Sequence, residues 1–456
     1  MKKLNIVVVL VLVMSLLFGF TVFGAASRTP KDALVMAANT EIFISLDPAI
    51  CYEVLPAVTL NALYDNLVGF KNVDEALVIQ PELAEYWEIS EDGMTYTFKL
   101  KDEAVFADGT EVLAEDVVWS YKRYLSLGSP SVWLLESIGI NKDNMDEKIV
   151  EIDRKTLSMT FDAPYAENIV LGIMDNSWGG VINKDVALEH EVDGDMGNAW
   201  LTDHSAGAGQ YVLDVWERNT MITMSANENY YGEKPNLKRI MMLEEVAKVD
   251  GVKVVQTPGH SNEYLAMNAS WGPLQDKRVR QAIKYAINYD EIVDVIMAGE
   301  LLTNNSQTRQ DEAAKVQSDL KRVGIDAEIV IMQASQMYPK YRAQGHELII
   351  AGWGNDYADA DNLAMAMASY DAGQLAYRCA WDDDYADALA VAGRFETNPD
   401  KREQIYEDLT TYWHLNGPFA MFYQSVEYWG VREEVKNFYD SAYGYSMTFN
   451  WGGFAK

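Results

Sequence analysis

A cluster of carboxyl and amide side chains follows a short apolar run late in the chain. The run is Leu348–Ala351, and after Trp353 come five polar residues: Asn355, Asp356, Asp359, Asp361 and Asn362. Such a run is typical of a buried strand, and open α/β sheets bind ligands just past the C-terminal ends of their strands. A carboxylate beside an indole suits an ammonium group, or a polar ligand that can also stack. We interpret this cluster as part of a binding site.

The residues before the cluster predict the elements that position it. Apolar residues recur at spacings of three and four across Asp311–Val323, which predicts a helix, and Gly324 follows as its C-cap. Alternating apolar residues then predict a strand over Ile325–Ile331. A helical stretch around Gln333–Gln344 leads to the strand Leu348–Ala351. We therefore expect a βαβ crossover, with Asp356 at its ligand-facing rim.

The chain carries no motif that predicts catalysis. Its five histidines form no HExxH pair, and the sequence has neither a GxSxG turn nor a phosphate-binding P-loop. The aspartate runs match no twelve-residue EF loop. We expect no enzyme activity, no metal and no cofactor. A glycosidase that uses two carboxylates stays an open alternative, because acidic residues are abundant and their separations are unknown.

Charge and cysteine content limit the partners. The chain has 37 Lys and Arg against 69 Asp and Glu, for a net charge of −32. A phosphate backbone or an anionic membrane would be repelled, so nucleic acid is not an expected partner.

Cys51 and Cys379 are the only cysteines, too few for a disulfide framework. We predict two independent, partly buried free thiols.

The N-terminus predicts export. Lys2 and Lys3 precede an apolar stretch from Leu4 to Phe23, and small residues follow at Gly24–Ala26. This is the plan of a secretory signal peptide, residues 1–26. An uncleaved membrane anchor is the alternative, because the stretch is long enough to span a bilayer. No cysteine lies near the cleavage region, so a lipid on an N-terminal cysteine is not expected.

Aromatic residues next to polar ones indicate a ligand cleft. The chain has 12 Trp, 26 Tyr and 14 Phe, and Trp381 is followed directly by three aspartates. Apolar and aromatic walls with a few fixed polar groups suit a small-molecule site. Ordinary core filling is the competing interpretation, and it must account for most of these residues.

Longer segments together resemble one protein family. They are Leu83–Leu100, Phe106–Tyr121 (FADGTEVLAEDVVWSY), Gly207–Leu213, Asn227–Tyr231, Tyr264–Asn268, Pro273–Ile283 and Glu347–Asn362. On these segments the chain resembles the family-5 extracellular solute-binding proteins, which serve peptide-type ABC transporters. The resemblance covers nearly all of the chain after the signal peptide. The chain is shorter than usual for this family, after Val246 and after Asn305, where parts of the second lobe look absent.

The resemblance implies an α/β, two-lobed periplasmic-binding-protein fold with an extra subdomain on the first lobe and the ligand cleft between the lobes. It places the first lobe at residues 27–72, 186–246 and 439–456, the subdomain at 73–185 and the second lobe at 247–438. The implied function is capture of a peptide or similar small solute by hinge closure and delivery to an ABC permease, by a monomer outside the cytoplasm. An oligosaccharide ligand, a secreted two-carboxylate enzyme and a degraded member that binds nothing are the alternatives.

The resemblance also implies the role of one ligand-binding residue. In family members with a Trp-Gly-x-Asp-Tyr pattern the aspartate takes the α-ammonium of the peptide, and Asp356 holds that place here. The alternative is that Asp356 only caps a helix beginning near Asp361, a role for which Asp359 competes. The full set of expected ligand-binding residues is Asp356, Trp353, Asn355, Tyr357, Tyr52, Glu53, Asn268 and Trp381.

Overall fold

The computed structural model describes most of the chain and divides it into two lobes. The described residues are 30–37, 40, 43–73, 76–129, 131–243, 252–289, 307–432, 434–442 and 449–456. The expected signal peptide, residues 1–26, lies outside them. Within the described part, no helix has the length and apolar character needed to cross a membrane.

The first lobe contains a four-stranded sheet in the order β1-β10-β9-β8. Its strands are Ala33–Ala37 (β1), Arg239–Leu243 (β10), Met221–Ala226 (β9) and Tyr211–Glu217 (β8). β1 and β10 run parallel, while the other pairs are antiparallel. Helix α2 (Val54–Leu63) and the C-terminal residues Trp451 and Phe454 share the core beside this sheet. The C-terminus therefore returns to the first lobe.

A second sheet in the first lobe is antiparallel, in the order β4-β5-β7-β6. Its strands are Ala84–Ile89, Thr95–Leu100, Thr156–Thr160 and Ile149–Asp153, and a hairpin joins β2 (Val68–Val73) to β3 (Ala76–Pro81). In β5 the burial alternates, which places Tyr96, Phe98 and Leu100 in the core. The helices of this lobe are α3 (Ala114–Leu127), α4 (Trp133–Glu136), α5 (Met145–Lys148), α6 (Glu167–Met174), α7 (Lys184–Glu189) and α8 (Asn198–Leu201).

The second lobe is built on three antiparallel strands in the order β12-β11-β13. They are Leu348–Gly354 (β12), Val252–Met267 (β11) and Phe419–Arg432 (β13). Apolar clusters cover both faces, one around Tyr264 and Phe419 and the other around Leu265 and Phe422. The helices are α9 (Lys277–Ala286), α11 (Gln307–Arg322), α12 (Ala334–Arg342), α13 (Ala360–Ala368), α14 (Leu375–Arg378), α15 (Asp384–Phe395) and α16 (Pro399–Asn416).

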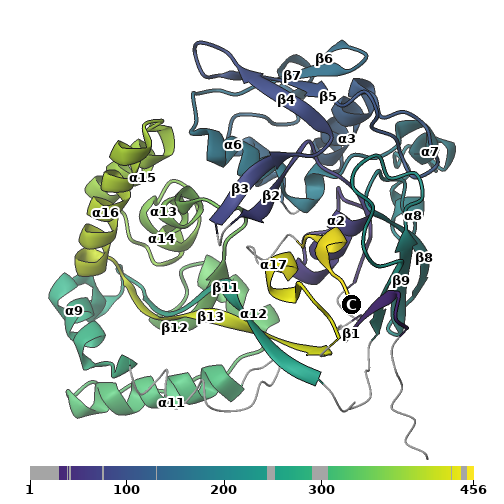
Figure 1. Cartoon of the computed structure of the whole chain (residues 1–456). Helices are drawn as coiled ribbons and strands as arrows, with labels where there is room; N and C mark the ends of the chain where they lie inside the picture. The colour runs from purple at the N-terminus through teal and green to yellow at the C-terminus, as the bar shows by residue number, and fades with distance from the viewer. Residues whose placement is uncertain are drawn as a thin grey trace, which may run out of the picture.

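Two long strands connect the lobes. β11 and β13 extend, antiparallel to each other, between the helices of the second lobe and the region of β1 and α17 (Phe438–Ala442) in the first (Figure 1). Val255 and Val431 pack on the core of the first lobe, whereas Leu265 and Phe422 pack in the second. The pairing of β11 with β13 shifts register between Pro258 and Asn262. A bulge of this kind locally disrupts the ladder, so the connection is irregular between its two ends.

The expected βαβ crossover is wrong. The helix is present as α11 and ends with Gly324 at φ +84°, as the C-cap prediction requires, but residues 325–333 form no strand. The carbonyl of Ala327 accepts from the side-chain amide of Gln317 (2.6 Å), and Val330 and Ile331 are exposed. β12 pairs antiparallel with β11. Alternation alone does not supply a neighbouring strand, and in the part of the chain that the structure describes no strand pairs with this segment.

The thiol prediction is confirmed, with deeper burial than expected. Cys51 and Cys379 are both free and buried, 2% and 0% exposed. Burial raises the pKa of the Cys379 thiol to about 12, and thiolate is the reactive form. We expect neither thiol of the native protein to react with a disulfide reagent at pH 7, and both to react in denaturant. Rapid reaction of either thiol before unfolding would contradict this burial.

Candidate functional site

Asp356 lies in the loop between β12 and α13, at the contact between the lobes. Its side chain is 6% exposed. The phenol of Tyr52, in the first lobe, donates to Oδ1 of Asp356 over 2.6 Å. Within the described residues the other carboxylate oxygen, Oδ2, is buried without a hydrogen-bond partner. A buried carboxylate oxygen is costly to leave unpaired, so this atom is suited to a donor from a ligand.

The backbone of Asp356 is fixed from both lobes. Its N–H donates to Oδ1 of Asn362 (3.3 Å), and its carbonyl accepts from Nδ2 of Asn176 in the first lobe (3.0 Å). Asp359, not Asp356, caps helix α13, because its carboxylate accepts from the N–H of Asp361 (2.7 Å). The carboxylate of Asp356 is therefore not used as a helix cap.

The protonation of Asp356 is set by two opposing effects. Burial raises the pKa of its carboxyl, while the hydrogen bond from Tyr52 and the polar side chain of Asn362 lower it. Burial also raises the pKa of Tyr52, so that phenol stays protonated and acts as the donor. An ammonium ligand needs the ionised carboxylate, so its affinity should fall as the pH drops through the raised pKa of Asp356.

Replacing Tyr52 with phenylalanine should move this loss of affinity to higher pH. The substitution removes a hydrogen bond to the ionised form of Asp356, so the pKa of Asp356 rises further. A bond of this kind is worth up to about tenfold in affinity. Titration calorimetry of a free-amine dipeptide between about pH 4 and pH 7 measures the effect, a range in which the peptide ammonium stays charged. Identical pH profiles for the two proteins would contradict the Tyr52 role.

Trp353, Asn355 and Tyr357 surround Asp356. Trp353 is partly buried, its indole N–H finds no acceptor in the described part of the chain, and the guanidinium of Arg378 lies 5.3 Å from its ring. Oδ1 of Asn355 is likewise buried without a described partner. Tyr357 is 3% exposed and packs in the core of the first lobe. The loop after β12 therefore inserts into the first lobe.

Of the other residues expected to bind the ligand, one lies near Asp356 and two lie elsewhere in the second lobe. Glu53 lies beside Tyr52, but its carboxylate is exposed and accepts a long bond from the N–H of Tyr52 (3.4 Å). The side-chain amide of Asn268 donates to the carbonyls of Gln344 and His346 and accepts from Ser270. Trp381 is 4% exposed in the core of the second lobe.

Asn268 and Trp381 lie away from Asp356 because they are at the opposite end of β12. Met267 pairs with Leu348, the first residue of that strand, and the carbonyl of Cys379 accepts from Ala269. A strand of seven residues spans about 20 Å. The structure therefore gives both residues a structural role and does not bring them into the site.

A cavity of about 470 Å³ lies between the lobes beside this loop. Trp133 and Ser137 line it from the first lobe, and Trp353, Tyr357 and Asn362 line it from the second. Residues of α13, of α15 and of the segment 369–374 between them also line the cavity, among them Met365, Ala366, Val391 and Arg394. The size is that of a small-molecule site. Sequence reasoning missed Trp133 and Arg394, and no motif or spacing marks either of them.

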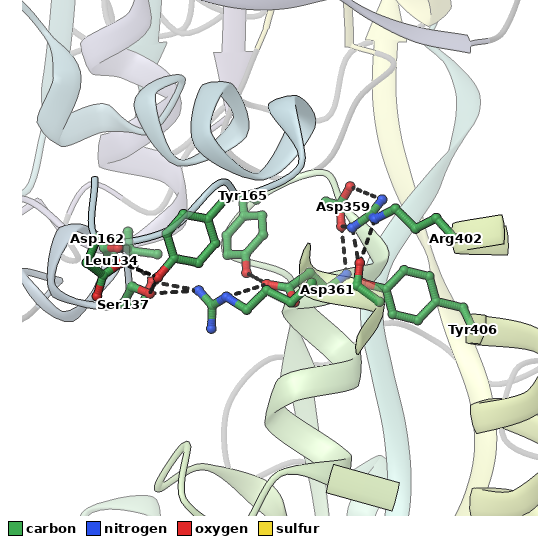
Figure 2. Close-up of polar contacts among 11 residues, drawn as sticks. Leu134, Ser137, Asp162, Tyr165, Asp359, Asp361, Arg402 and Tyr406 are labelled. Atoms are coloured by element: carbon green, nitrogen blue, oxygen red, sulfur yellow. Dashed lines mark hydrogen bonds and ion pairs between the residues drawn. The ribbon is translucent and has the colours of Figure 1, made fainter. Parts of the chain in front are cut away.

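A polar network crosses between the lobes at the wall of this cavity (Figure 2). Arg394 donates from Nη2 to the carbonyl and hydroxyl of Ser137 over 2.9 and 3.2 Å. Its guanidinium also lies 5.2 Å from the ring of Tyr165. Asp361, 0% exposed, accepts from the phenol of Tyr357 (2.6 Å). Arg402 holds Asp359 through two bonds of 2.9 and 2.5 Å. The loop that carries Asp356 is thus anchored on both sides.

The described residues hold no group of three or more His, Cys, Asp or Glu side chains placed to bind a metal ion. The site can supply a buried carboxylate with one free oxygen, aromatic walls and amide groups. These groups suit binding of a small polar ligand with a cationic end.

Comparison with known proteins identifies the family. A relative from Escherichia coli (strain K12), described as "Probable D,D-dipeptide-binding periplasmic protein DdpA", is 24% identical, with 91% of this chain and 92% of the relative covered. The periplasmic binding protein DppA from Helicobacter pylori, solved with the peptide STSA, has a TM-score of 0.72 at 20% identity, over 93% of this chain and 98% of that one. NikA from Brucella suis, solved with Fe(III)-EDTA, has a TM-score of 0.75 at 18% identity, over 93% and 99%. These structures confirm the two-lobed fold.

The family model for "Bacterial extracellular solute-binding proteins, family 5 Middle" matches residues 78–244, 242–303 and 299–374, which is more than half of the chain. The three matched segments meet close to the two places where the sequence looks shortened. The chain belongs to the family-5 bacterial extracellular solute-binding proteins.

Proposed function

We propose that this protein captures a short peptide, or a similar small solute with a free ammonium group, and delivers it to an ABC permease. The observation that carries the proposal is the buried Oδ2 of Asp356, which has no described partner while Tyr52 holds Oδ1. Relatives named for dipeptide binding support a peptide over an oligosaccharide, and a binding-protein family supports capture without catalysis. No cofactor is needed.

The proposed boundaries follow the expected ones. We assign residues 27–72, 186–246 and 439–456 to the first lobe, 73–185 to the subdomain and 247–438 to the second lobe. The irregular pairing of β11 with β13 at Pro258–Asn262 supports a hinge there. We also propose that the protein is exported with cleavage near Ala26, acts as a monomer, and carries no lipid on an N-terminal cysteine.

Calorimetry with matched ligands tests the ammonium assignment. A free dipeptide such as Ala-Ala and its N-acetyl derivative differ in the charge at one end, so the free form should bind and the acetylated form should bind far more weakly. Native mass spectrometry of protein purified without denaturation would identify a ligand retained in the cleft. Equal affinity for the two forms would contradict the ammonium role, and preferred binding of a manno- or cello-oligosaccharide would support the sugar alternative.

Ligand is expected to shift the protein towards a more compact, more stable state. A ligand that contacts both lobes stabilises the closed arrangement over an open one, and it raises the melting temperature by mass action. Small-angle scattering should show a smaller radius of gyration with saturating dipeptide than without it. An unchanged radius at proven saturation would contradict hinge closure and favour a rigid cleft.

A further inference from the structure

If the amino terminus of a peptide binds Asp356, the cavity beside this residue is placed to receive the next part of the peptide. Trp353 and Tyr357, which line it, are close neighbours of Asp356 in the sequence, and Asn362, also in its wall, accepts from the N–H of Asp356. The free oxygen of Asp356 belongs to a carboxylate, so it is the acceptor best suited to the ammonium. A dipeptide held there would extend its second residue along the cavity wall. The lining of that wall should then select the second side chain.

Two carboxylates line this cavity without a fixed countercharge. Asp371 and Asp387 both face it. In the part of the chain that the structure describes, neither forms an ion pair or a side-chain hydrogen bond; the ion pairs nearest to them in sequence are those of Asp361 and Arg394, and of Asp359 and Arg402. Asp371 is exposed and Asp387 is partly buried, and no described cation engages either one, so both can interact with a cation in the cavity.

The two nearby guanidinium groups are already engaged. Arg394 lines the cavity, but it donates to Ser137, lies over the ring of Tyr165, and has Nε 3.9 Å from the buried carboxylate of Asp361. Arg378 donates to Gln374 and lies over the rings of Trp353 and Tyr341. The cavity wall itself carries two carboxylates, those of Asp371 and Asp387, and one guanidinium, that of Arg394, which is already bonded to Ser137.

The rest of the wall suits the stem of a long basic side chain. Met365, Ala366 and Val391 offer apolar surface, and the rings of Trp133, Trp353 and Tyr357 add aromatic surface. Methylene groups pack on such surface while a charged head reaches carboxylates or an aromatic ring face. An acidic side chain in the cavity would be repelled by Asp371 and Asp387.

We propose that this cavity is a subsite for a cationic side chain, so that the preferred ligands are peptides with a basic residue next to a free amino terminus. The inference rests on the proposed function, because it takes Asp356 as the ammonium ligand. It adds Asp371 and Asp387 as specificity-determining residues, and Trp133 as a wall contributed by the first lobe.

Three dipeptides that share one free amino terminus separate this inference from the proposed function. They are Ala-Lys, Ala-norleucine and Ala-Glu; norleucine keeps the aliphatic stem of lysine without the ammonium. By calorimetry at low ionic strength, Ala-Lys should bind about tenfold more tightly than Ala-norleucine, as a charged hydrogen bond predicts, and Ala-Glu should bind most weakly. Added salt should reduce the preference for lysine.

A double substitution, Asp371→Asn with Asp387→Asn, should remove the preference for Ala-Lys and leave the affinity for Ala-norleucine nearly unchanged. Asp382→Asn is the control, because it removes an exposed carboxylate that does not line the cavity. Thermal unfolding confirms that each variant is folded.

Each outcome decides one point. Equal binding of Ala-Lys and Ala-norleucine to the wild-type protein overturns the cationic subsite while the proposed function stands. A lysine preference that survives the double substitution overturns the roles of Asp371 and Asp387. Failure of all three dipeptides to bind the folded protein overturns the proposed function, and this inference with it.

Discussion

Replacing Asp356 with asparagine is expected to weaken binding of a free-amine dipeptide by about tenfold to a hundredfold. The carboxylate is buried with one oxygen free, and a charged hydrogen bond in such a setting is worth about 1.5–3 kcal/mol. Asparagine keeps the shape, and its amide oxygen can still accept from the phenol of Tyr52. Titration calorimetry of wild type and Asp356→Asn near pH 7 measures the loss of dipeptide affinity when the carboxylate is replaced by a neutral amide.

The Asp356→Asn substitution should weaken ligand binding without lowering the stability of the fold. Burial raises the pKa of Asp356, which means that the folded protein gains nothing from the negative charge of this group in the absence of a ligand. Thermal stability of the unliganded variant should therefore stay close to that of the wild type. Asp359→Asn serves as the contrast: it weakens a cap and an Arg402 contact, so it should lower the melting temperature. Equal dipeptide affinities for wild type and Asp356→Asn would refute the ammonium role.

Local sequence patterns predicted the part of the site that a single loop supplies. The apolar run before Trp353 became β12, and Asp356 follows it as expected. The partner of Asp356, Tyr52, is 304 positions away, so no local pattern joins the two residues. Asn268 and Trp381 were also expected to bind the ligand. Residue type does not report which end of a strand a side chain occupies, and both lie at the wrong end of β12.

In the fold, too, features set by local sequence were predicted correctly, and features set by distant contacts were not. The helix before Gly324 is present because its spacing and its C-cap are local features. The strand expected at Ile325–Ile331 is absent because a strand needs a paired edge, and the sequence of one segment does not encode its neighbour. Trp133 and Arg394 belong to the cavity wall only because the two lobes meet there, which no local pattern records.

A buried ion pair in the first lobe fixes the segment that carries Tyr52. Arg123 on α3 donates from Nη1 and Nη2 to Asp47 over 2.7 and 2.6 Å, and both side chains are 0% exposed. The carbonyl of Asp47 accepts from the N–H of Cys51, one residue before Tyr52. Further bonds to Asp47 come from Asn198 and from the N–H of Ala49. The pair thus links α3 to the position of the donor to Asp356.

Replacing Arg123 with methionine should lower the free energy of unfolding by about 3–5 kcal/mol, the cost of leaving one partner of a buried pair uncompensated. Denaturant unfolding measures it, read as a shift in midpoint at constant slope. Lys122→Met is the matched control from the same helix. Lys122 pairs with Asp146, which is 82% exposed, so the free energy of unfolding should fall by about 1 kcal/mol or less.

Adding Asp47→Asn to Arg123→Met should recover part of the lost stability, because it removes the unpaired charge. Equal midpoints for the Arg123 and Lys122 variants would show that the buried pair contributes no more than a surface pair, and that Tyr52 is positioned by other contacts.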